Sequence, residues 1–179
     1  LISRWAEILR GVEGARLVLK SAPFRDAGTR AHYHAMFAAH GIAAERVDLL
    51  GYIPSAAAHF TLYNRIDVAL DTDPYNGATT TCEALWMGVP VVTLAGRSHV
   101  GRVGAAILTH LGLEELIATS PEDYVARAVA LARDPARLSA LRASLRPRME
   151  ASPLRAEIPF TRALEDAYRA AWRGWCAGP

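Results

Sequence analysis

The sequence predicts an α/β domain built on a doubly wound parallel sheet with Rossmann-like topology. Short apolar runs, each of the length of one strand, alternate along the chain with longer segments of helical periodicity. This alternation requires crossover connections, which place parallel strands side by side with helices on both faces of the sheet. The expected strands are residues 16–20, 47–50, 68–70, 89–94 and 116–118.

The first third of the chain supplies three helices, one before the first strand and two between strands. Apolar residues at helical spacing predict that the chain opens with an amphipathic helix over residues 1–10. A second helix is expected over residues 29–40, where Gly41 ends it. Ser55 is a favourable N-cap for a third helix over residues 56–64.

Residues 70–94 have the layout of a phosphate-binding site. An apolar strand run is followed by a turn with Gly77, and then by three consecutive threonines at residues 79–81. Their hydroxyls are expected to cap a helix over residues 82–87. The free N–H groups and the dipole of such a helix would face an anion in front of the loop. The alternative is an ordinary capped helix that follows a strand and binds nothing.

The second half of the chain continues with helices. One is expected over residues 101–111, and another runs from a strong start signal at Ser120-Pro121 to about residue 133. A further helix is expected over residues 135–149. Two prolines, Pro153 and Pro159, should then break the chain before a last amphipathic helix. We expect that helix over residues 161–175.

Composition limits the class of protein. Hydrophobic residues make up 51% of the chain and charged residues 21%, and the net charge of +2 is too small to favour nucleic-acid binding. No apolar run approaches the roughly 20 residues that span a bilayer. The two cysteines form no CxxC pair, so we expect free thiols and a cytoplasmic, reducing location. The chain lacks an initiator methionine, and we expect it to be a piece of a longer protein.

Several polar side chains follow the expected strands. Ligands in doubly wound folds bind outside the carboxyl ends of the strands. Lys20, His59, the threonines at 79–81 and Arg102 should all lie at that edge, where they would suit a nucleotide diphosphate. A surface ion pair for Lys20 and a purely structural role for Arg102 remain equally open.

Three sequence motifs give the chain a family resemblance. Residues 70–72 are Leu-Asp-Thr, residues 76–80 are Asn-Gly-x-Thr-Thr, and residues 83–93 are Glu-Ala-Leu-Trp-x-Gly-x-Pro-Val-Val-Thr. This pattern resembles the O-linked N-acetylglucosaminyltransferase family, including its bacterial and SPINDLY-type members, over nearly the whole chain. The resemblance implies that residues 1–179 are the nucleotide-sugar-binding, C-terminal lobe of a GT-B glycosyltransferase.

The resemblance also implies roles for individual residues. Thr79 and Thr80 match the family's pair that contacts the donor diphosphate, beside Gly77. His59 matches a histidine beside the uridine, and Glu83 matches the acidic position that binds the ribose hydroxyls. A carboxylate suits a vicinal diol because it offers two acceptor oxygens. The loop that offers backbone groups to the uracil edge is formed by Ile53, Pro54 and Ser55.

The implied activity is an inverting transfer of N-acetylglucosamine from UDP-N-acetylglucosamine to Ser or Thr hydroxyls of proteins, without metal or other cofactor. Partners are then a nucleotide sugar and a protein acceptor, with no nucleic acid and no membrane. Alternatives are a GT-B transferase that uses another sugar, such as GDP-fucose, or a lipid or glycan acceptor. A lobe that binds nucleotide or a protein partner without catalysis is the alternative from another class.

The chain departs from the family pattern at two positions. Ala78 stands where animal members have histidine, and Ala56 stands where they have a lysine near the ribose. The family's diphosphate-stabilising lysine, its general base, its acceptor site and its helical repeats are expected upstream of Leu1. The donor could therefore be bound less tightly, or with another sugar preference.

The last segment, residues 155–179, is expected to contact the other lobe. In GT-B enzymes the terminal helix typically crosses to that lobe, and here its apolar side chains form one stripe. The stripe consists of Phe160, Leu164, Tyr168, Trp172 and Trp175.

Asp71 and Asp73 mimic the DxD metal motif of another glycosyltransferase class. They lie at a strand-to-turn junction of a different kind of sheet, so we expect no metal there. Asp71 is instead expected to accept hydrogen bonds from the backbone of the Asn76-Gly77 loop.

Overall fold

The computed structural model describes residues 1–178, and all of its strand pairs are parallel. The strands are β1 (Leu17–Lys20), β2 (Val47–Leu50), β3 (Ala69–Leu70), β4 (Val91–Leu94) and β5 (Ile117–Ala118). The helices are α1 (Ile2–Gly11), α2 (Ala27–Ala38), α3 (Ala56–Leu62), α4 (Thr79–Trp86), α5 (Val103–His110), α6 (Pro121–Ala132), α7 (Pro135–Ala151) and α8 (Glu157–Ala177). The predicted α/β class with parallel strands is confirmed.

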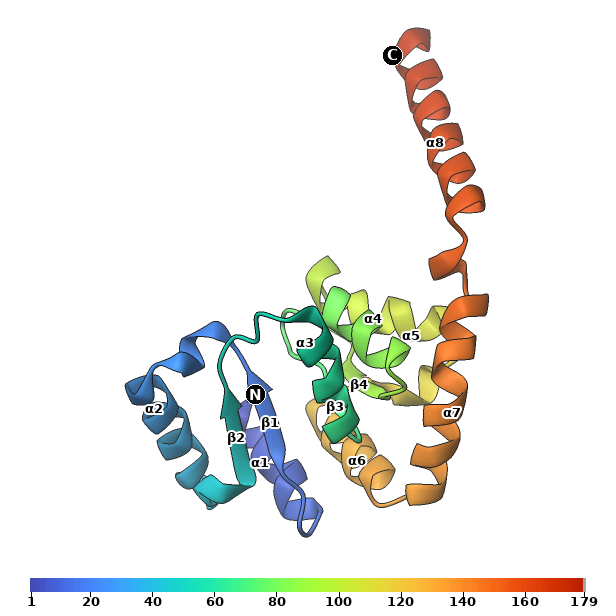
Figure 1. The fold of residues 1–179 in the computed structure, drawn as a ribbon. Coiled ribbons are helices and arrows are strands. Elements are labelled where there is room, and N and C mark those ends of the chain that lie inside the picture. The colour runs from blue at the N-terminus through green and yellow to red at the C-terminus, as the bar shows by residue number, and fades with distance from the viewer. Residues whose placement is uncertain (179) are drawn as a thin grey trace.

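The backbone ladder has two parts. β1 pairs with β2 over four residues, and the second part has the strand order β3-β4-β5. β3 is one residue shorter than its apolar run predicted. Hydrogen bonds from Ala69 N to Pro90 O and from Asp71 N to Val92 O, both 2.9 Å long, join it to the segment of β4. Helices α4 and α5 lie on one side of β3 and β4, and α6 lies on the other (Figure 1).

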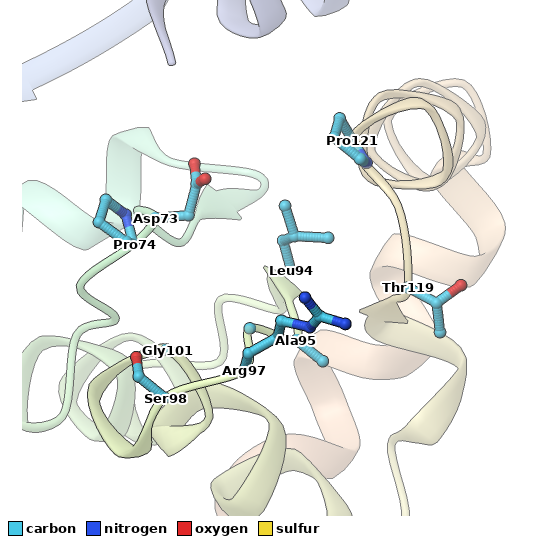
Figure 2. Close-up of a pocket in the computed structure, with 10 residues that line it drawn as sticks. Asp73, Pro74, Leu94, Ala95, Arg97, Ser98, Gly101, Thr119 and Pro121 are labelled. Carbon is cyan, nitrogen blue, oxygen red and sulfur yellow. The ribbon is translucent and has the colours of Figure 1, made fainter.

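The loops at the carboxyl ends of β3, β4 and β5 surround a pocket of about 240 Å³. Asp73 and Pro74 come from the first loop, Arg97 and Ser98 from the second, and Thr119 from the third (Figure 2). The edge of the sheet where ligands bind in doubly wound folds is therefore hollowed in this chain.

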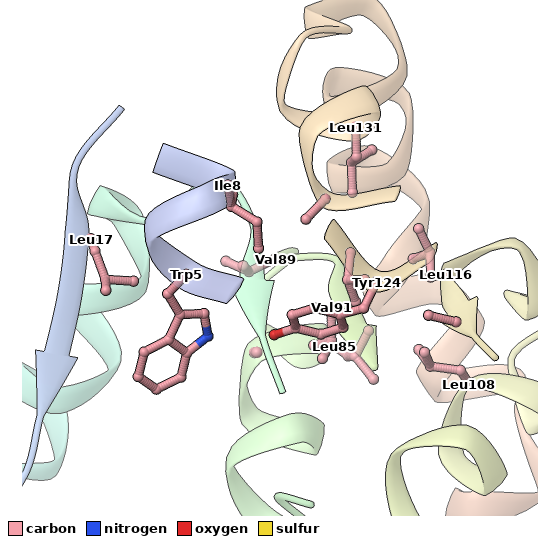
Figure 3. Packing of buried hydrophobic residues seen from close by; sticks show 14 of the residues in the cluster. Trp5, Ile8, Leu17, Leu85, Val89, Val91, Leu108, Leu116, Tyr124 and Leu131 are labelled. Carbon is pink, nitrogen blue, oxygen red and sulfur yellow. The ribbon is translucent and has the colours of Figure 1, made fainter. Parts of the chain in front are cut away.

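The core is one cluster that extends from the β1–β2 pair, past α1, to the second ladder and the helices around it. Trp5 and Ile8 of α1 face Val91 of β4 and Tyr124 of α6 across a continuous apolar cluster (Figure 3). Tyr124 is 1% exposed, and its hydroxyl donates to the backbone carbonyl of Asp71 over 2.9 Å. The core thus extends directly beneath the end of β3, where the polar loop begins.

Helix α4 begins three residues earlier than the sequence predicted. Its N-cap is Ala78, and no side chain caps it. The Thr81 hydroxyl instead donates to the carbonyl of Gly77, four residues back, over 2.9 Å. That bond is typical of a threonine inside a helix. The prediction that the threonines cap this helix was therefore wrong.

Arginines of α7 donate hydrogen bonds to backbone carbonyls at the ends of other elements. Arg146 Nε donates to the carbonyl of Trp86 at the end of α4 over 3.0 Å, and its guanidinium lies 4.8 Å from the centre of the Trp86 ring. Arg148 donates to Leu111 O and Gly112 O after α5. Arg142 donates to Ile66 O before β3. These side chains satisfy carbonyls that helix and turn ends leave without partners.

Helix α8 begins at Glu157, so Pro159 does not break the chain as predicted. A proline is compatible with the first turn of a helix, because the N–H it lacks has no partner there. The helix projects away from the rest of the molecule (Figure 1). Trp172 is 67% exposed and Trp175 is 80% exposed. Within residues 1–178, no helix is both long and apolar enough to cross a membrane.

Candidate nucleotide-binding site

Lys20, His59 and Glu83 meet at the carboxyl end of β1. Lys20 Nζ lies 2.8 Å from Nδ1 of His59, and Nε2 of His59 lies 3.0 Å from Oε2 of Glu83. An ammonium group can only donate, so Nδ1 must accept, and the ring proton must be on Nε2. His59 is therefore a neutral imidazole that donates to the carboxylate, and both of its nitrogens have protein partners.

Tyr63 joins the same carboxylate, and sequence reasoning missed it. Its hydroxyl donates to Oε2 of Glu83 over 3.3 Å from the turn that follows α3. Burial, and then the negative charge of Glu83, raise the pKa of Tyr63 above its ordinary value of 10. The hydroxyl thus stays protonated and acts as a donor. An aromatic residue in a helical segment is usually a core residue, so the sequence held no signal for this contact.

The start of α4 faces the same region without a side-chain cap. Thr79 and Thr80 are exposed, and neither hydroxyl forms a hydrogen bond within residues 1–178. Gly77 lies so close to them that a Cβ atom there would be 2.5 Å from Thr80 Oγ1. The first N–H groups of the helix and two free hydroxyls are thus presented together, an arrangement that favours an anion.

Asp71 holds the loop that leads to this helix start. Its Oδ1 accepts from the N–H groups of Gly77, over 2.8 Å, and Thr72, over 2.9 Å. Its Oδ2 accepts from the Thr93 hydroxyl over 2.7 Å. Burial raises the pKa of Asp71, although these hydrogen bonds act in the opposite direction. The interpretation of Asp71 as an acceptor for the loop backbone is confirmed.

Both carboxylates of the acidic pair at the end of β3 have protein partners. Both oxygens of Asp71 accept the hydrogen bonds described above, and Asp73 forms an ion pair with Arg4 of α1. Among residues 1–178, no group of three or more His, Cys, Asp or Glu side chains is placed to hold a metal ion.

The family model for glycosyl transferase family 41 matches residues 1–164. The chain belongs to glycosyl transferase family 41. Proteins similar to this chain include several named as probable UDP-N-acetylglucosamine–peptide N-acetylglucosaminyltransferase SPINDLY. The protein from Solanum lycopersicum is 44% identical and that from Oryza sativa subsp. japonica is 46% identical, each over 97% of this chain and 19% of its own length.

The fold of this family 41 chain also matches a solved structure. A mutant O-GlcNAc transferase from Thermobaculum terrenum superposes with a TM-score of 0.92 at 42% sequence identity. The match covers 98% of this chain and 34% of that one. The family resemblance inferred from the motifs is thus confirmed, and the chain spans about a fifth of the length of the curated relatives named above.

The remaining predicted residues lie in other loops of the family 41 chain. Ser55 caps α3 by accepting from Ala58 N over 3.3 Å, and Ile53 and Pro54 form the loop between β2 and that helix. Arg102 donates to the carbonyl of Gly96 over 3.3 Å, so its guanidinium closes its own loop. This hydrogen bond favours the purely structural role for Arg102. None of the site residues predicted from the sequence lines the pocket of Figure 2.

Proposed function

We propose that this chain is the donor-binding lobe of an enzyme that transfers N-acetylglucosamine from UDP-N-acetylglucosamine to Ser or Thr hydroxyls of proteins. The observation that supports it most is the position of Glu83 on α4. Glu83 follows Thr79 by four residues and Thr80 by three, so its side chain is a neighbour of each threonine on the helix surface. A diphosphate at the helix start and a ribose diol one turn further along would then belong to one nucleotide.

The roles within the site follow from the chemistry of each group. Thr79, Thr80 and the N–H groups behind Gly77 would stabilise the negative charge that develops on the leaving diphosphate. Glu83 would accept hydrogen bonds from the ribose hydroxyls. The loop of Ile53, Pro54 and Ser55 would face the base. Lys20 supports the site through His59, so its predicted contact with phosphate is no longer part of the proposal.

Metal-independent binding is also part of the proposal. The chain would neutralise the diphosphate with helix N–H groups and hydroxyls in place of a cation. Both carboxylates of the Asp71-Asp73 pair have protein partners, which supports this view. UDP affinity should accordingly be the same with and without a chelator.

The protein acceptor, the general base and the contact made by residues 155–179 are proposals about the longer protein. We propose that the exposed stripe of α8 packs against a part of that protein outside this chain. The solvent exposure of Trp172 and Trp175 supports this contact. A cytoplasmic location likewise stays a prediction.

The test is calorimetric titration of this chain with UDP, UDP-N-acetylglucosamine, GDP and GDP-fucose. We expect weak binding of the two uridine ligands and no transfer to a Ser- or Thr-containing peptide, because the chain spans only about a fifth of its relatives. If the chain prefers the guanosine ligands, the proposed donor is wrong and GDP-fucose takes its place. Transfer by the chain alone would contradict the assignment of the base and acceptor site to other residues.

Replacement of Glu83 by glutamine tests the ribose contact. The amide keeps the shape of the side chain but removes the charge and one acceptor. UDP binding should weaken by about 1.5–3 kcal/mol, as for other hydrogen bonds to charged groups, and pyrophosphate binding should not change. Equal losses for both ligands in calorimetry would mean that Glu83 only supports the helix.

A further inference from the structure

We infer that Tyr63 is a positioning residue that holds one oxygen of Glu83 and leaves the other to a ribose diol, so that the site selects ribonucleotides over 2′-deoxyribonucleotides. The inference rests on the proposed function, because it concerns the same donor site. Tyr63 lies outside the family motifs described above. The inference is that Tyr63 affects recognition of the ribose of the nucleotide indirectly, by positioning Glu83.

The two oxygens of Glu83 differ in their surroundings. Oε2 receives both the Nε2–H of His59, over 3.0 Å, and the hydroxyl of Tyr63, over 3.3 Å. A carboxylate oxygen has two lone pairs, so these two donors saturate Oε2. Within residues 1–178, Oε1 has no hydrogen-bond donor. A ligand diol can therefore bind Glu83 only through Oε1, and not through both oxygens as the sequence suggested. The position of the diol then depends on how the carboxylate is turned.

Tyr63 is well held for this purpose. Its ring packs against the edge of the hydrophobic core and lies edge-on to the His59 ring, with the centroids 5.5 Å apart. Its backbone carbonyl accepts from Arg142 Nη2 of α7 over 3.4 Å. The raised pKa of its hydroxyl keeps the proton in place as a donor at neutral pH. The hydroxyl lies nearer to Oε2 of Glu83, at 3.3 Å, than to its other acceptor, the carbonyl of Thr80, at 3.5 Å. Both ends of the residue are thus held, and the hydroxyl can fix Glu83 in turn.

Lys20 fixes the second donor in the same way. Its ammonium group, 2.8 Å from Nδ1, permits only the tautomer of His59 that has its proton on Nε2. His59 and Tyr63 therefore approach Oε2 from two elements, α3 and the turn that follows it, and together they prevent rotation of the carboxylate. Loss of either donor would leave Glu83 free to turn its second oxygen away from the ligand.

The experiment compares Tyr63→Phe with the unchanged chain by calorimetry. The ligands are UDP, 2′-deoxy-UDP, GDP, 2′-deoxy-GDP and pyrophosphate. The unchanged chain should prefer the ribo form of its nucleotide by about 10- to 150-fold, the size expected for one hydrogen bond to a charged group. In Tyr63→Phe this preference should fall to less than about threefold, while pyrophosphate binding, which also reports that the variant is folded, stays unchanged.

Tyr33→Phe is the matched control. It also removes one phenolic hydroxyl, but that hydroxyl forms no hydrogen bond within residues 1–178, and the ring contact with Phe24 at 4.9 Å remains. The ribo preference should survive in this control. A preference that is equal in Tyr63→Phe and in the unchanged chain, or absent from both, overturns the inference and leaves the proposed function standing. Failure of the unchanged chain to bind either nucleotide pair overturns both.

Discussion

Replacement of Asp71 by alanine should lower the free energy of unfolding by about 2–4 kcal/mol, the cost of leaving buried donors without acceptors. Asp71 accepts from Thr93, whose side chain is fully buried, and from the backbone of Gly77 and Thr72. Urea denaturation of the chain followed by circular dichroism measures the loss.

Two variants make this prediction specific. Asp71→Asn keeps the volume and one carbonyl oxygen, so it should cost clearly less than alanine. Asp67→Ala removes a carboxylate that is 84% exposed and 3.6 Å from Arg142, so it should change stability by less than about 0.5 kcal/mol. Equal losses for Asp67→Ala and Asp71→Ala would show that the Asp71 hydrogen bonds do not anchor the loop.

The pH dependence of Asp71 has a definite sign. Its pKa in the folded chain is above the ordinary value of 3.8 because of burial, so the folded state binds the proton more tightly than the unfolded state does. Stability from this group is therefore fully present below pH 3.8 and is lost as the pH rises through the folded pKa. As the pH rises from 3.8 through the folded pKa of Asp71, the unchanged chain should lose stability relative to Asp71→Asn. A constant difference between the two would contradict the raised pKa.

Replacement of Thr80 by valine should weaken UDP binding by about 1.5–3 kcal/mol, or about 10- to 150-fold. Valine has the shape of threonine but lacks the hydroxyl that is proposed to donate to the diphosphate. The structure makes the test cleaner than the sequence suggested, because the N-cap of α4 is Ala78 and the Thr80 hydroxyl caps nothing. The melting temperature should therefore change little, and calorimetry measures the ligand contact by itself.

Thr80→Ser and uridine are the controls for that prediction. Serine keeps a hydroxyl at the same position, so most of the UDP affinity should remain. Uridine has no phosphate, so its binding should be the same in the serine and valine variants. Parallel weakening of uridine and UDP would mean that Thr80 holds the loop, and the diphosphate assignment would be wrong.

Local signals in the sequence predicted the elements that depend on local chemistry. Ser120, with Pro121 in the first turn, starts α6 as expected, and Ser55 caps α3. The rule that ligand groups gather at the carboxyl ends of parallel strands correctly brought Lys20 and His59 together, although Lys20 is 39 residues from its partner. These features follow from hydrogen-bonding preferences that act within a few residues, or from strand direction alone.

The features that the sequence did not predict depend on tertiary contacts. The three threonines look like capping residues, but the helix extends back to Thr79, and the Thr81 hydroxyl donates to the carbonyl of Gly77, just before the helix. Tyr63 has the pattern of a core residue, and only the fold brings its hydroxyl to Glu83, 20 residues away. The sequence held no signal that Arg146 and Arg148 of α7 donate to carbonyls at the ends of α4 and α5.

Arg146 also changes the electric field in front of the proposed donor site. The peptide dipoles of a helix place about half a positive charge at its start and half a negative charge at its end. In α4 the negative pole at Trp86 is met by a guanidinium from α7, whereas no side chain forms a capping hydrogen bond at the positive pole, Ala78. The two poles therefore no longer balance, and an anion near Thr80 experiences the attraction of one pole with less opposition from the other. A residue 60 positions along the chain from Trp86 thus contributes to the potential at the opposite end of that helix.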